Sequence, residues 1–190
     1  MRVLVGCEES GVVRRSFRAL GHDAWSCDLL PARDGSPFHH QRDLGHVLAD
    51  QRAHPFWDLA IFHPPCTDIA VSGARWMAAK GKARIDAALD FVRLCMDANI
   101  PRIAVENPIS IISTRIRKPD QTIQPWQFGH PETKATCLWL KNLPPLKPTN
   151  IVEGREQRVW KMPPGPDRAR ARSETYQGIA AAFASQWGSL

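Results

Sequence analysis

A thiol and a carboxylate, forty residues apart, are the side chains in this sequence whose types and settings best suit chemistry. Cys66 follows a Pro-Pro pair after an apolar run, and such a pair forms a stiff turn that holds the next side chain in place. A cysteine held there can be a nucleophile, although a buried, inert thiol is the commoner role. Glu106 begins a Glu-Asn-Pro sequence after another apolar run, where a carboxylate can hold a ring nitrogen or merely cap a helix.

Two further loops could bind a nucleotide. Gly6 and Gly11 lie in the first strand-to-helix turn, which has fewer glycines than a dinucleotide fingerprint. Asp28 ends the next strand roughly 20 residues later, where an acid accepts hydrogen bonds from ribose hydroxyls in Rossmann-like sites. Turn geometry and a solvated strand end explain these residues equally well.

The elements that must position these loops follow from hydrophobic periodicity. We expect Ser10 to cap a helix with Val13, Phe17 and Leu20 on one face, and Ser173 to start the final helix. That final helix would present Ile179, Phe183 and Trp187 on one side. Strands are predicted over residues 2–5, 23–27, 58–62, 102–105 and 136–140, and further helices over 44–49 and 85–96.

This alternation of strands and helices predicts an α/β fold with a doubly wound, mostly parallel sheet. Ligands bind at the carboxyl ends of the strands in such sheets, which brings forward the loops at 6–11, 28–30, 63–67 and 106–108. We expect a single domain over 1–190, with a loop-rich substrate lobe at 109–172. In that lobe, aromatic residues are predicted to form a small satellite core of Trp126, Phe128, Trp139 and Trp160.

Composition excludes several classes of protein. The 190 residues are 43% apolar and 23% charged, which argues against disorder, and no apolar run is long enough to span a bilayer. Five cysteines without a CxxC pair argue against a disulfide framework and a zinc site, and the short apolar start argues against a signal peptide. We therefore expect a cytoplasmic protein without a bound metal.

Positive charge is concentrated in one stretch of the chain. Residues 101–172 contain thirteen Lys and Arg against six Asp and Glu, whereas the remainder contains twelve against thirteen. A surface of this kind is suited to phosphates, although a solvated basic surface is the alternative. Arg115, Arg117 and Lys134 are the candidates for contact with a nucleic acid.

Taken in order, the segments resemble those of the S-adenosylmethionine-dependent DNA cytosine-5 methyltransferases. DLAIFHPPCTDIAVSG resembles their Pro-Cys nucleophile motif, and IAVENP resembles their Glu-Asn-Val motif with Pro108 in place of valine. AWSCDLL is similar to the segment with the ribose-binding acid, QRDLGHVL to the segment whose acid reaches the adenine, and SETYQGIAAAFASQWG to the last motif beside the cofactor. The resemblance covers residues 1–108 and the final helix, and is nearest to short, phage-type members.

The resemblance implies a Rossmann-like methyltransferase fold and covalent catalysis at cytosine. Cys66 would add to C6 while Glu106 holds N3 and the exocyclic amine; C5 would then accept the methyl group, and a base would remove the C5 proton. The implied cofactor contacts are Gly6, Cys7, Glu8, Ser10, Gly11, Asp28, Leu29, Asp43, Leu44 and Pro64. The substrate contacts assigned by motif and charge are Pro65, Thr67, Asn107, Arg115, Arg117, Lys134 and Arg158.

Departures from the family pattern keep alternatives open. Only 64 residues, 109–172, separate the two late motifs, which leaves little room for a target-recognition domain. The substrate is therefore DNA read with low sequence selectivity, or a free cytosine nucleotide such as dCMP. The small number of glycines in the first loop, and Gly178-Ile179 in place of Gly-Asn, raise a further alternative, a non-catalytic binding module. Arg155, Gln157 and Arg158 match the family's Gln-x-Arg-x-Arg motif only in part. Neither a membrane nor an obligate protein partner is indicated.

Overall fold

The computed structural model describes residues 1–50, 56–72, 77–165 and 168–190. Among them, seven strands form one sheet in the order β3-β2-β1-β4-β5-β7-β6. The first five strands of that order are parallel, whereas β7 runs antiparallel to both β5 and β6. The strands are β1 (Arg2–Gly6), β2 (Asp23–Asp28), β3 (His39–Gln41), β4 (Leu59–Phe62), β5 (Arg102–Pro108), β6 (Gln121–Ile123) and β7 (Thr136–Lys141).

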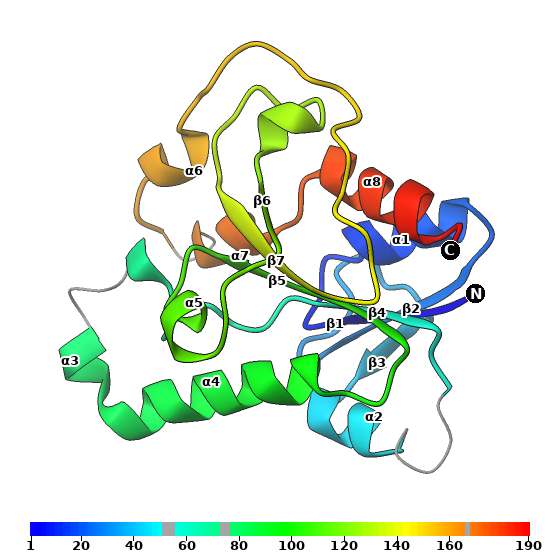
Figure 1. Ribbon diagram of the computed structural model, residues 1–190, viewed down its shortest axis with the longest axis horizontal. Helices are drawn as coiled ribbons and strands as arrows, with labels where there is room; N and C mark the ends of the chain where they lie inside the picture. Colours follow the sequence, from blue (N-terminus) through cyan, green and yellow to red (C-terminus); the bar gives the residue numbers. More distant parts are fainter. Residues whose placement is uncertain (51–55, 73–76, 166–167) are drawn as a thin grey trace.

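Helices cover both faces of this sheet, which confirms the predicted doubly wound, mostly parallel α/β fold (Figure 1). Helices α1 and α8 lie together on one face, and α2 and α4 lie on the other. The helices are α1 (Val12–Ala19), α2 (Leu44–Asp50), α3 (Met77–Lys80), α4 (Lys82–Met96), α5 (Ile112–Arg115), α6 (Arg158–Lys161), α7 (Arg168–Ser173) and α8 (Gln177–Trp187). None of the helices in the described residues is long and apolar enough to cross a membrane.

Two hydrophobic clusters, one on each face, fix the sheet between these layers. Alternation along β1 sends Val3 and Val5 to the cluster under α1 and α8, and Leu4 to the cluster under α2 and α4. The predicted stripe of α8 is buried as expected, and Phe183 stacks on Trp187 with ring centroids 4.8 Å apart. The apolar strands therefore hold the loops at their carboxyl ends on a rigid base.

Two predicted helix starts are wrong. Helix α1 begins after Gly11, which has a φ of 70°. The Glu8 carboxylate, not Ser10, accepts the shortest hydrogen bond from the helix start, from the Val13 N–H at 2.6 Å. Leu20 lies beyond the helix and is 55% exposed. Ser173 ends α7 because its hydroxyl donates back to the Arg170 carbonyl, so the final helix starts only at Gln177.

The satellite core predicted for residues 109–172 is also wrong. Phe128 and Trp139 are buried, but they belong to different clusters on opposite faces of the sheet. Trp160 is 73% exposed, and Trp126 packs under the Arg155 guanidinium at 3.9 Å. Instead of folding around a core of its own, this segment contributes β6 and β7 to the main sheet.

Candidate active site

The Pro-Pro-Cys turn and the Glu-Asn-Pro sequence meet because β4 and β5 are parallel neighbours. Phe62 at the end of β4 pairs with Val105, one residue before Glu106. Two hydrogen bonds then join the last residues of β5 to the turn that follows β4. The Asn107 amide donates to the Pro64 carbonyl at 2.8 Å, and His63 Nδ1 lies 2.9 Å from Glu106 Oε2.

Cys66 is half-buried in a tight turn at this edge of the sheet. Its carbonyl accepts the backbone N–H groups of Ile69 at 3.1 Å and Ala70 at 2.8 Å, which holds the residue in one conformation. Burial, followed by the negative charge of Glu106, raises the pKa of the Cys66 thiol, while the positive charge of Lys134 acts in the opposite direction. The thiol is therefore mostly protonated at neutral pH in the free protein.

Glu106 carries the negative charge of the site. Burial alone raises the pKa of its carboxyl, but the hydrogen bond from His63 and the charge of Lys134 more than offset this and hold the pKa below its usual value. Lys134 lies just before β7, the antiparallel neighbour of β5, and burial lowers its pKa against the opposing effect of Glu106. Cys66, Glu106 and Lys134, predicted from distant segments, thus interact in one charge network.

Two buried polar atoms of this site have no hydrogen-bond partner among the described residues. They are His63 Nε2 and Asn107 Oδ1, on the two segments that carry Cys66 and Glu106. Buried polar atoms are normally paired, so unpaired ones at a reactive edge point to a ligand or water as their partner. His63 was not among the residues predicted to take part in the site, although it directly precedes the Pro-Pro pair of the predicted turn.

The residues predicted to bind the cofactor divide into two groups. Asp28 is half-buried at the end of β2, where Oδ1 accepts the Leu30 N–H at 2.9 Å and Oδ2 has no partner among the described residues. Its neighbour Leu29 is 69% exposed. An open carboxylate oxygen beside an exposed apolar side chain fits a ribose hydroxyl and an adenine ring, so the residues present suit an adenosine group.

The second group of predicted cofactor residues is engaged within the fold. Glu8 and Ser10 are buried at the start of α1, Leu44 is buried in the core, and Gly6 packs against Leu44 and Phe62. Four others have local backbone or capping roles: Pro64 accepts from Asn107, Asp43 accepts the Gly45 N–H at 2.7 Å, and both Cys7 and Gly11 have positive φ.

The predicted substrate residues are also distributed unevenly. Pro65 and Thr67 are exposed on either side of Cys66, and Arg115 is exposed on α5. The Arg117 guanidinium donates to Asp120 at 2.8 Å and to the Leu140 carbonyl at 3.1 Å, so it braces β7.

Lys134 and Arg158 share a hollow of about 360 Å³ with Tyr176 and Glu132. Arg158 donates to Glu132 at 2.8 Å, and the Tyr176 hydroxyl donates to the same carboxylate at 2.6 Å. Because Lys134 also interacts with Glu106 and Cys66, this polar hollow adjoins the reactive pair.

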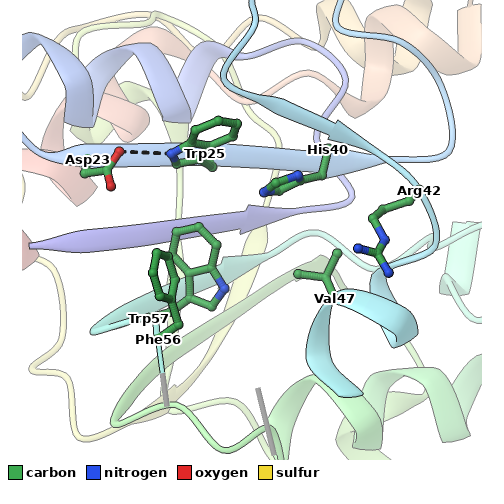
Figure 2. Close-up of a pocket in the computed structure, with 7 residues that line it drawn as sticks. All are labelled: Asp23, Trp25, His40, Arg42, Val47, Phe56 and Trp57. Carbon is green, nitrogen blue, oxygen red and sulfur yellow. Dashed lines mark hydrogen bonds between the residues drawn. The ribbon is translucent and has the colours of Figure 1, made fainter. Parts of the chain in front are cut away.

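A second hollow, of about 340 Å³, lies elsewhere on the sheet (Figure 2). Trp25 and His40, whose rings stack 4.8 Å apart, face Phe56 and Trp57 across it. None of the residues assigned to cofactor or substrate lines this hollow.

Solved structures of known proteins share the arrangement of this chain. A protein described as a DNA modification methyltransferase encoded within an E. coli prophage matches 86% of the chain with a TM-score of 0.55 and 14% identity. The S. pombe Dnmt2 methyltransferase matches 85% of the chain with a TM-score of 0.52 and 18% identity. This chain therefore shares the fold of these two proteins. It spans 55% of the length of each of those two chains, and neither a family model nor a curated protein matches its sequence.

Proposed function

We propose that this protein transfers a methyl group from S-adenosylmethionine to C5 of cytosine in DNA through a covalent adduct at Cys66. The observation that carries the proposal is the convergence of a half-buried thiol and an ionised carboxylate on neighbouring parallel strands of a methyltransferase fold. A nucleophile and a hydrogen-bond acceptor in one site are what addition to a pyrimidine requires.

Each side chain has a separate task in this reaction. The Cys66 sulfur adds to C6, and the Glu106 carboxylate accepts a hydrogen bond from the exocyclic amine. Asp28 and Leu29 would hold the ribose and adenine of S-adenosylmethionine, which supplies a methyl group on a positively charged sulfur. After methylation at C5, loss of the C5 proton to a base allows the C5–C6 double bond to reform and Cys66 to leave.

A second substrate class has its own support. The hollow beside Lys134 has a volume that suits a single nucleotide, and only 64 residues separate the two late motifs. A free cytosine nucleotide such as dCMP would need no target-recognition domain between them. The five free thiols support a location in the reducing cytoplasm for either substrate.

The test supplies S-adenosylmethionine with a labelled methyl group together with single-stranded DNA, duplex DNA or dCMP. We expect labelled 5-methylcytosine by mass spectrometry with the wild type, none with Cys66→Ala, and wild-type levels with Cys95→Ala, which removes a buried thiol on α4 as a control. Product from dCMP alone would favour the nucleotide substrate. Binding of cofactor or DNA without any product would refute methyl transfer and favour a non-catalytic module.

Covalent trapping gives a second readout. DNA containing 5-fluorocytosine lacks the C5 proton that must leave, so the adduct should persist and appear as a shifted band in a denaturing gel. The band should require both S-adenosylmethionine and Cys66. Its formation with Cys66→Ala would contradict the assignment of the nucleophile.

A further inference from the structure

We propose that His63 is a positioning residue that fixes the Glu106 carboxylate for base recognition, an inference that rests on the proposed function. The ring contacts Glu106 directly, with Nδ1 2.9 Å from Oε2. An ionised carboxylate can only accept hydrogen bonds, so Nδ1 must be the protonated nitrogen and the donor. The Thr136 side chain is a second hydrogen-bond partner of Glu106, and a carboxylate has enough acceptor positions left for the substrate.

The backbone holds His63 firmly enough for this task. It directly follows β4, its N–H donates to the Gly6 carbonyl of β1 at 3.0 Å, and the proline after it restricts its own backbone to extended conformations. Its side chain is only 11% exposed. The ring therefore enters the site from a strand end, where a donor can be placed accurately.

The surroundings of the ring make a purely structural role a poor explanation. Nε2 is buried with no partner among the described residues, and an unpaired buried polar atom destabilises the fold. An apolar side chain of similar size would avoid that cost. The ring interacts with the charge of Glu8, after β1, and with Glu106 on β5. Lys134 before β7 and Cys66 on the turn after β4 interact in turn with Glu106.

Three variants separate positioning from packing. His63→Leu removes the donor and the unpaired nitrogen, whereas His63→Asn keeps an N–H close to the position of Nδ1. The control is His22→Leu, because His22 contacts the chain terminus and not the site. We expect His63→Leu to lower kcat for cytosine methylation about 100-fold with little change in KM, a loss typical of a group that supports acid–base steps. His63→Asn should recover most of kcat, and His22→Leu should leave it unchanged.

The pH profile provides the readout that a structural role would not move. Because the bond from His63 helps hold the pKa of Glu106 low, His63→Leu should shift the acidic limb of kcat to higher pH, and His63→Asn should not. A His63→Leu enzyme within threefold of wild-type kcat, or with an unshifted acidic limb, would overturn the inference while the methyltransferase assignment stands.

A measurement without substrate keeps the two proposals distinguishable. The carboxyl ¹³C resonance of Glu106, assigned with Glu106→Gln, can be titrated in the wild type and in His63→Leu. A higher pKa in His63→Leu supports positioning even if no methyl transfer is found with any substrate. Equal titration in both proteins would refute it regardless of activity.

Discussion

Replacing Glu8 tests whether this buried carboxylate belongs to the fold or to the cofactor site. Its oxygens accept the N–H groups of Val13 at 2.6 Å and Arg14 at 3.3 Å. Glu8→Ala leaves both donors unpaired; a lost cap costs about 0.5–2 kcal/mol and a buried unpaired donor about 1–3 kcal/mol, which together give about 1.5–5 kcal/mol. For a chain of this size that loss lowers Tm by about 3–20 °C.

Glu8→Gln serves as the matched variant because it keeps an acceptor oxygen and removes the charge. Burial raises the pKa of Glu8 above its usual 4.5, so the folded state binds more protons than the unfolded state. Stability then falls as pH rises from 4.5 through the raised pKa. We expect Glu8→Gln to be at least as stable as the wild type at pH 7 and to lose less stability over that pH range.

Thermal and urea unfolding of the three proteins between pH 4 and 8, with calorimetry for S-adenosylmethionine, completes the experiment. A Glu8→Ala protein with the Tm of the wild type would refute the capping argument. A Glu8→Gln protein that is stable but no longer binds the cofactor would show that the carboxylate contacts it, as the sequence predicted.

Three other outcomes follow from the geometry. Alkylation of Cys66 by iodoacetamide should accelerate with pH beyond 9, because burial and Glu106 raise the thiol pKa, and Glu106→Gln should make it faster at a given pH. Gly178→Ala should lower Tm by several degrees, since its Cβ would overlap the Phe128 carbonyl oxygen and lie 2.9 Å from the carbonyl carbon. Asn107→Ala should cost about 1–3 kcal/mol in urea unfolding, because it leaves the buried proline carbonyl without its donor.

Hydrophobic periodicity predicted the helices and strands that form the layers of this fold, but it did not reveal the short polar strands. The apolar runs at 58–62 and 102–105 became β4 and β5, and the stripe at 85–96 became α4. Strands β3 and β6 have only three residues each and read His-His-Gln and Gln-Thr-Ile, so neither offers an apolar run. Their backbone bonds to β2 and β7 decide their structure, and such long-range pairing is not visible in local sequence.

The site was predictable where it depends on strand order and unpredictable where it depends on side-chain pairing. Cys66 and Glu106 could be placed together because one follows β4 and the other lies near the carboxyl end of β5, its parallel neighbour, although residues 106–108, predicted as a loop, belong to β5. Arg117 and Lys134 carry equal charges in similar polar sequence, yet one pairs with Asp120 and the other interacts with Glu106. Arg117 finds its partner three residues away, whereas Lys134 reaches Glu106 because β7 pairs with β5.

The charges of the site connect nucleophile activation to base recognition in the proposed reaction. His63 and Lys134 hold a negative charge on Glu106, and that charge suppresses a second one on Cys66. Like charges in one site disfavour each other, so the carboxylate opposes the thiolate and Lys134 favours it. In the proposed reaction Glu106 accepts a hydrogen bond from the exocyclic amine of cytosine, whereas uracil and thymine present a carbonyl there. The carboxylate would thus select the base, and Lys134 would be the group that favours the thiolate.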